Sequence, residues 1–231
     1  MKIRKIKRIV IEFMSLVLLS GLAWAADTRV AMPLTQEGGT ARAMSMGSAV
    51  VGVPMGSASL LWNPAGLGLM DNCMELGLHQ NSGLGDSNQE KAVFGIPLGI
   101  LGGFGASFDY VNNGSFEGRD SFGNPTGNYT AGDLGGSLGW GKKWFPGFAA
   151  GVAVKYNQQT LANRSYTAYA ADLGVLWNPP KFSRLTMGLN YSNLGDEVAG
   201  SALTSGWRAG ASYEATKDLL LALSGNLERD G

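Results

Sequence analysis

Beyond residue 70, the sequence repeatedly alternates between large apolar or aromatic residues and small or polar ones. In residues 148–156 the large positions are Phe148, Ala150, Val152, Val154 and Tyr156, separated by Ala, Gly, Ala and Lys. A period of two places alternate side chains on opposite faces of a β-strand. A water-soluble sandwich needs a bulky inner face, but here the second face is glycine, serine, asparagine and single charges. That pattern is typical of strands with lipid outside and a polar lumen inside.

The alternating stretches predict nine antiparallel strands. They lie at about residues 74–80, 92–98, 103–111, 133–141, 148–157, 166–177, 184–192, 206–214 and 219–228. Long polar connections (81–91, 112–132, 158–165 and 193–205) alternate with short turns, as external loops and periplasmic turns do in outer-membrane barrels. We therefore predict an all-β fold, an antiparallel transmembrane β-barrel, located in the bacterial outer membrane.

Two further features of these strands bear on the barrel prediction. Interfacial girdles place aromatic side chains near strand ends, and such positions here hold Tyr110, Trp140, Trp144, Tyr156, Trp177, Tyr191, Trp207 and Tyr213. An odd strand count leaves an unpaired edge in lipid, which is very costly. We therefore expect residues 71–231 to be a partial barrel of about nine strands, truncated at its C-terminus.

The first 25 residues predict a secretory signal peptide. A basic start is followed by an apolar run at 13–22 and by Ala23-Trp24-Ala25, a small-x-small cleavage site. The apolar run is too short for a membrane-spanning helix. Removing this segment takes away five of the 18 basic residues and one of the 18 acidic ones, leaving a formal charge of −4. No basic excess then remains for nucleic-acid binding.

Residues 26–70 are too few for a domain and are rich in Gly, Ala, Ser and Met. Thr40 or Ser45 is a candidate for the start of a short helix, and Ser57 to Trp62 for a second helix that Asn63-Pro64 ends. We expect this short helical segment to pack against the barrel as a plug.

Catalytic, metal and cofactor sites are not indicated. Cys73 is the only cysteine and His79 the only histidine, so neither a disulfide nor a transition-metal site is expected. A hydrolase needs a nucleophile, a base and an orienting group, and no Gly-x-Ser-x-Gly motif accompanies His79. We expect His79 to face the lumen, and the protein not to be an enzyme.

Residues 39–67 contain two motifs: Gly39, Arg42, Met46, Gly47 and Ala49, followed by Trp62, Asn63, Pro64, Ala65, Gly66 and Leu67. In these positions the segment resembles the start of the PorV/PorQ branch of the FadL-like outer-membrane superfamily. Residues 151–156, 170–177 and 188–195 are also similar to that branch. The family barrel has fourteen strands, which agrees with a truncated chain. The resemblance implies a barrel partly closed by its N-terminal segment.

The resemblance also implies a function. FadL-like members pass hydrophobic molecules across the outer membrane, and PorV-like members hold exported proteins at the surface in type IX secretion. The expected partners are outer-membrane lipid, a hydrophobic ligand or secreted proteins, and secretion components. The alternative is a structural or adhesive barrel that acts through its surface loops. By alternation, Asp109, Lys155, Asp172, Arg208 and Glu228 face the lumen, and an Arg42–Asp172 pair is the first plug contact to test.

Overall fold

The computed structural model describes residues 39–229, except for residues 84–86, 163, 196 and 199–200. The expected signal peptide and residues 26–38 lie outside the described residues. So do the side chains of residues 197–198, 201–202 and 228–229, and with them the expected position of Glu228.

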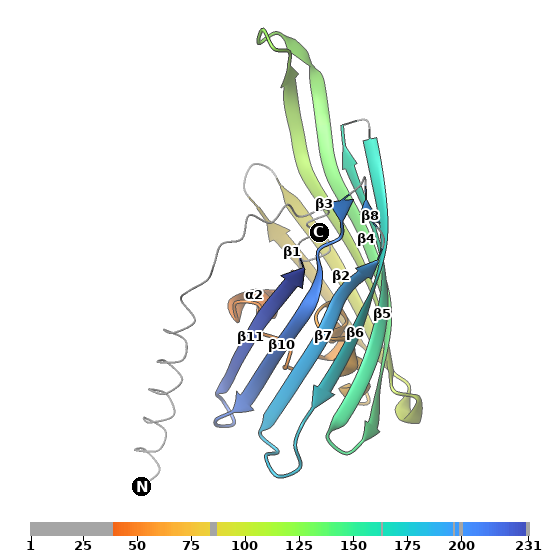
Figure 1. Ribbon diagram of the computed structural model, residues 1–231, viewed down its shortest axis with the longest axis vertical. Coiled ribbons are helices and arrows are strands. Elements are labelled where there is room, and N and C mark those ends of the chain that lie inside the picture. The colour runs from red at the N-terminus through yellow and green to blue at the C-terminus, as the bar shows by residue number, and fades with distance from the viewer. Residues whose placement is uncertain (1–38, 84–86, 163, 196, 199–200, 230–231) are drawn as a thin grey trace, which may run out of the picture.

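One antiparallel sheet of nine strands dominates the fold (Figure 1). Its strands, in spatial order, are β1 (Glu75–Ser82), β2 (Asn88–Pro97), β3 (Gly103–Arg119), β4 (Pro125–Phe145), β5 (Phe148–Leu161), β6 (Arg164–Trp177), β7 (Leu185–Gly195), β10 (Ser205–Glu214) and β11 (Leu220–Arg229). A separate two-stranded ladder joins β8 (Glu197–Val198) to β9 (Ser201–Ala202). The predicted nine antiparallel strands are confirmed. The sheet is open in the part of the chain described here, because β1 and β11 pair with one neighbour each.

The expected long loop at residues 112–132 is wrong. β3 continues to Arg119 and β4 begins at Pro125, so most of this region is a hairpin that projects beyond the other strands (Figure 1). Asp120 closes its turn by accepting hydrogen bonds from the backbone N–H groups of Phe122 (2.9 Å) and Asn124 (2.8 Å). The Asn124 side chain also donates to this carboxylate and lowers the pKa of Asp120. Both faces of the outer half of this hairpin are exposed, so its sequence lacks the apolar alternation that marked the other strands.

Among the described residues, three short helices precede the sheet. They are α2 (Ala41–Ser45) and the 3₁₀ helices η2 (Gly56–Leu61) and η3 (Pro64–Leu69). Thr40 begins α2, because its hydroxyl accepts the N–H of Ala43 at 3.3 Å, whereas Ser45 ends this helix. The expected helix over Ser57 to Trp62 is present as η2. It ends before Asn63-Pro64, as expected, but a third helix that we did not expect begins at this pair.

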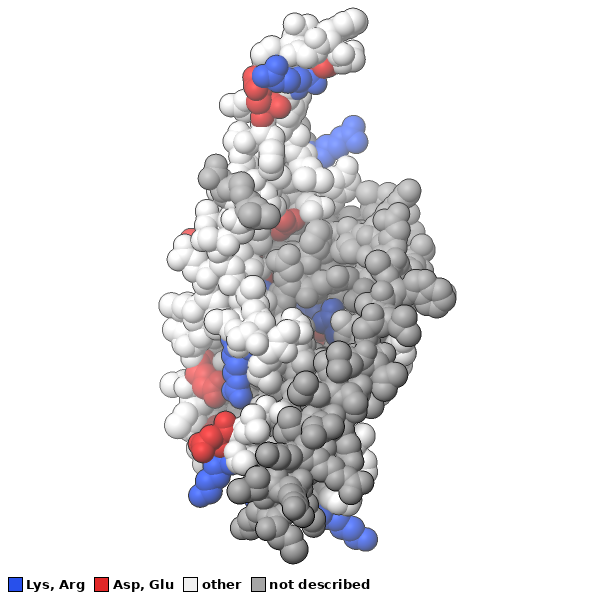
Figure 2. Space-filling model, turned by 90° about the vertical axis from the view of Figure 1, so that its left-hand side faces the viewer, with Lys and Arg blue, Asp and Glu red and all other residues white. Residues whose placement is uncertain are grey.

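The two faces of the sheet differ in what they contact. The face that packs against residues 39–70 is here called the inner face, and those residues the covering segment (Figure 1). The other, outer face exposes large apolar side chains on all nine strands, among them Leu78, Phe94, Phe108, Leu138, Val152, Leu173, Leu189, Trp207 and Leu223. Figure 2 shows charged side chains clustered on the projecting hairpin and again toward the opposite end. No helix among the described residues is long and apolar enough to cross a membrane.

Candidate functional site: the inner face and its covering segment

Inward-facing glycines make room for the covering segment. A Cβ atom on Gly151 would lie 2.5 Å from the backbone of Pro64, and one on Gly52 would lie 2.8 Å from the carbonyl oxygen of Gly210. A Cβ on Gly188 would overlap the carbonyl oxygen of Val51. Backbone lies against backbone at these positions, so any side chain would force the two layers apart.

These glycines form a belt across the sheet because strand pairing aligns them. The register pairs Gly95 with Gly105, Gly105 with Gly139, Gly141 with Gly151, Gly151 with Gly174, and Gly188 with Gly210. Leu67 lies against Gly105, and Pro64 against Gly141 and Gly151. The belt is therefore a fitted groove for η3 and for the residues around Gly52.

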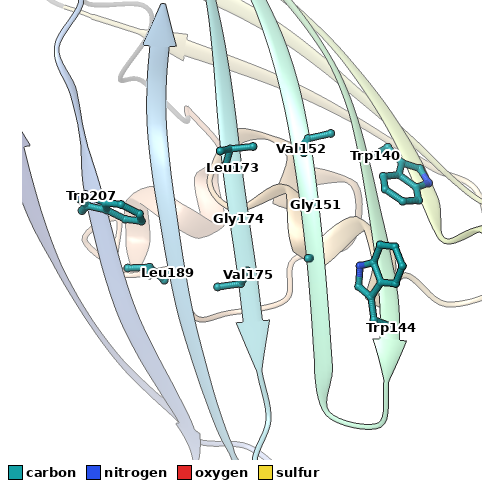
Figure 3. Close-up of a pocket in the computed structure, with 10 residues that line it drawn as sticks. Trp140, Trp144, Gly151, Val152, Leu173, Gly174, Val175, Leu189 and Trp207 are labelled. Atoms are coloured by element: carbon teal, nitrogen blue, oxygen red, sulfur yellow. The ribbon is translucent and has the colours of Figure 1, made fainter.

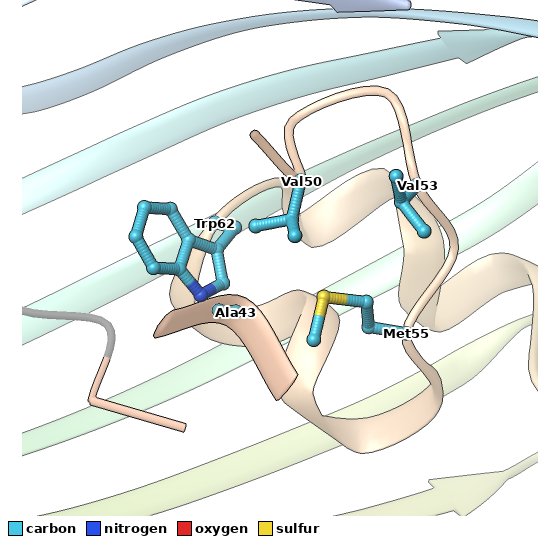
Figure 4. Packing of buried hydrophobic residues seen from close by; sticks show 5 residues of the cluster. All are labelled: Ala43, Val50, Val53, Met55 and Trp62. Atoms are coloured by element: carbon cyan, nitrogen blue, oxygen red, sulfur yellow. The ribbon is translucent and has the colours of Figure 1, made fainter. Parts of the chain in front are cut away.

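The covering segment also has an apolar core of its own. Ala43, Val50, Val53, Met55 and Trp62 form one buried cluster (Figure 4), which Leu220 and Ala222 of β11 complete. Leu60 and Leu67 form a second cluster with Ala153 of β5. Burial of this much apolar surface holds the segment on the inner face.

Asn63 fastens the covering segment to the sheet. Its side-chain amide donates to the backbone carbonyls of Val51 and of Val175 in β6, both at 3.0 Å. Its side-chain oxygen accepts the N–H of Ala65 at 3.2 Å and so begins η3, with Pro64 at the first position. An Asn cap followed by Pro is a known start signal for a helix, and it could have predicted η3 from the sequence.

Replacing Asn63 with alanine should lower the free energy of unfolding by about 2 kcal/mol, because buried carbonyls lose their donor. Denaturant unfolding of the protein in detergent micelles, followed by tryptophan fluorescence, measures this change. The exposed Asn226 provides the matched control, and Asn226→Ala should change the value by less than about 0.5 kcal/mol. Equal values for the two variants would contradict the fastening role.

Within the part of the chain that the structure describes, two buried ion pairs lie on the inner face. Lys91 pairs with Asp109 at 2.5 Å, and Gln89 donates to the same carboxylate. Lys155 pairs with Asp172 at 2.6 Å. Asp172 also accepts the backbone N–H of Asn193 at 2.9 Å, and Lys155 donates to the Asn193 side-chain oxygen at 3.2 Å. These polar groups are enclosed and mutually satisfied, as buried charges must be.

A second polar group lies near β7 and β10. The Arg208 guanidinium carbon is 6.0 Å from the centre of the Trp62 ring, a cation–π arrangement between sheet and covering segment. Asn190 is the cross-strand neighbour of Arg208. Within the described structure, the Asn190 side-chain amide, the Arg208 Nε and the Trp62 Nε1 are buried without a hydrogen-bond partner. Such groups are usually satisfied by ordered water.

No family model matches the chain, and no curated protein matches it. The PorV/PorQ resemblance therefore stays a prediction from motifs. The structure shows where the two motifs lie: both belong to the covering segment, and the second one, residues 62–67, contains Asn63 and most of η3. Arg42 is exposed on α2, Met46 packs against the Trp62 cluster, and Gly39 and Gly47 adopt positive φ angles of 53° and 60°. A side chain on Gly66 would collide with Ser59.

The structure places the expected lumen residues Asp109, Lys155, Asp172 and Arg208 on the inner face, all well or largely buried. It does not bring Arg42 to Asp172, so that expected plug contact is wrong. The Asp172 carboxylate forms its ion pair with Lys155 instead. Sequence reasoning also missed Asn63 as a fastening residue and Lys91 as the partner of Asp109. His79 is partly buried, and the described residues hold no group of three or more His, Cys, Asp or Glu placed to bind a metal ion.

Proposed function

We propose that this protein is a non-enzymatic outer-membrane β-barrel component of PorV/PorQ type. It passes hydrophobic small molecules or holds exported proteins at the cell surface, and its covering segment is the plug. The observation that carries the proposal is the outer face, which exposes large apolar side chains on every strand of the sheet. A patch of this extent is incompatible with exposure to water, whereas lipid covers it at no cost.

The inner face supports the plug assignment. It carries charged and polar side chains on β2, β3, β5, β6 and β10, which a lipid-facing surface would not hold. The glycine belt and Asn63 hold the covering segment against these strands. In the proposed barrel, this segment would block the route through the lumen unless it moves.

Cell fractionation tests the proposal directly. We expect the chain to be recovered with outer membranes and to resist extraction by alkaline carbonate, because its outer face is apolar around all nine strands. Recovery in the soluble periplasmic fraction would contradict the proposal. Deleting residues 42–62 should then raise uptake of a hydrophobic dye or impair display of an exported protein.

The projecting hairpin of β3 and β4 favours the adhesive alternative. Phe122 at its tip is 89% exposed and Phe116 is 54% exposed, so the hairpin offers two aromatic side chains for contact with another surface. Shortening the hairpin by removing residues 115–130 distinguishes the two functions. Loss of cell adhesion with unchanged uptake and secretion would favour the adhesive function, and the opposite result would favour the plugged conduit.

A further inference from the structure

The outer face carries an apolar groove of about 420 Å³ between β4 and β10 (Figure 3). This size lies within the usual range for small-ligand sites. Trp140 and Trp144 stand at one side, Trp207 and Leu189 at the other, and Val152 and Leu173 lie between them. We call it the outer groove.

The floor of the outer groove is low where the outward-facing side chain is small. Ala150 adds only a methyl group there, beside the exposed backbone of Gly151 and Gly174. A second depression of about 680 Å³ adjoins it, sharing Val175 and Leu189 and floored by Ala209 and Ala211. Together they form an extended apolar depression bordered by large side chains.

The two tryptophans of the outer groove make defined contacts and have a cation beside them. Trp140 donates to the Leu101 carbonyl at 2.8 Å and meets Trp144 edge-on, with ring centres 6.4 Å apart. The Lys142 ammonium lies 5.3 Å from the centre of the Trp144 ring. Exposed Lys181 and Arg184 lie in the β6–β7 connection at the same end of the sheet. An apolar groove with cations near one end matches a lipid with an anionic headgroup.

We propose that the outer groove binds an acyl chain of an anionic phospholipid, whose phosphate pairs with Lys142. This inference rests on the proposed membrane location. The acyl chain lies over Ala150 and Gly151 between the tryptophans and Leu189. The site thus lies at the short-connection end, which is the periplasmic side in the orientation of outer-membrane barrels.

Native mass spectrometry of the full chain, released from detergent with phosphatidylglycerol or phosphatidylcholine of identical acyl chains, tests the proposal. We expect preferential retention of phosphatidylglycerol. Lys142→Gln should weaken that retention about fivefold and leave phosphatidylcholine unchanged, since one lysine near a phosphate contributes roughly that factor. Lys217→Gln, in the β10–β11 connection, is the matched control and should behave as the unmodified protein. Ala150→Phe fills the groove and should reduce retention of both lipids.

Three results would overturn the proposal: equal retention of the two lipids, no effect of Lys142→Gln, or a dimeric mass that Ala150→Phe abolishes, which would assign the groove to a second copy of the chain. If Ala150→Phe does not fold, lipid binding in the outer groove can be measured by the quenching of tryptophan fluorescence by brominated acyl chains. In vesicles, Lys142→Gln should reduce quenching by brominated phosphatidylglycerol and not by its choline counterpart. Failure of the membrane proposal itself is distinguishable, because the chain would then not fractionate with membranes at all.

Discussion

Valine at position 151 is expected to push the covering segment off the inner face. Its Cβ would lie 2.5 Å from the backbone of Pro64 and 2.6 Å from the amide nitrogen of Ala65, neither of which can rotate away. Overpacking of this kind costs about 3 kcal/mol at the upper end of its usual range. We therefore expect Gly151→Val to lower the free energy of unfolding by about that amount and to expose residues 39–70 to protease.

Gly225→Val is the control for this prediction. Gly225 lies on β11, and a Cβ there would meet no atom within 4 Å, so the same added volume has no clash to relieve. Limited proteolysis followed by mass spectrometry of the N-terminal fragments measures the release of the segment. Equal protection in the two variants would show that the segment does not depend on the glycine belt.

The same variant connects the packing to the proposed conduit. If the covering segment is a plug, its release should raise uptake of a hydrophobic dye in cells that carry Gly151→Val, and Gly225→Val should leave uptake at its original level. Increased protease access without increased uptake would mean that the segment is structural and that no route lies behind it.

The sheet could be predicted from the sequence because each strand must present an apolar outer face, and a period of two records that requirement in residues such as Phe108, Val152 and Trp207. The outer part of the β3–β4 hairpin could not, since both of its faces are exposed and its sequence carries no alternation. The glycine belt was visible in the sequence only as glycines on the second face of separate strands. Its alignment depends on the strand register, which pairs Gly151 with Gly174 across β5 and β6.

The ion-pair partner of Asp172 on the inner face also depends on the strand register, which the sequence does not show. The sequence indicated that Asp172 faces inward and needs a cation, and the motif placed Arg42 in the plug. In the structure Asp172 lies opposite Ala153, so Lys155 on β5 is its diagonal cross-strand neighbour and reaches the carboxylate from within the sheet. Arg42 is on the exposed side of α2. One element was predictable and missed: η2 ends before the Asn63-Pro64 pair, as expected, but the same pair also begins η3.

Removing the Asp172 carboxylate should be among the most destabilising single changes in the chain. Asp172 is 1% exposed and Lys155 is largely buried, so Asp172→Leu would leave an ammonium group enclosed without its counter-charge and Asn193 N–H without its acceptor. Breaking a buried pair in this way typically costs about 3–5 kcal/mol. Denaturant unfolding in micelles should show a loss of that size.

The double variant separates the cost of an orphaned charge from the value of the pair. With Lys155→Met added, no buried ammonium remains, and we expect most of the stability lost in Asp172→Leu to return, since apolar replacement of a whole buried pair is often neutral. The coupling energy from this cycle should therefore be large relative to the net change of the double variant. If the decreases in the free energy of unfolding of the two single variants instead simply add, water reaches Lys155 on the inner face. The covering segment would then leave a hydrated passage there, which would contradict its role as a plug.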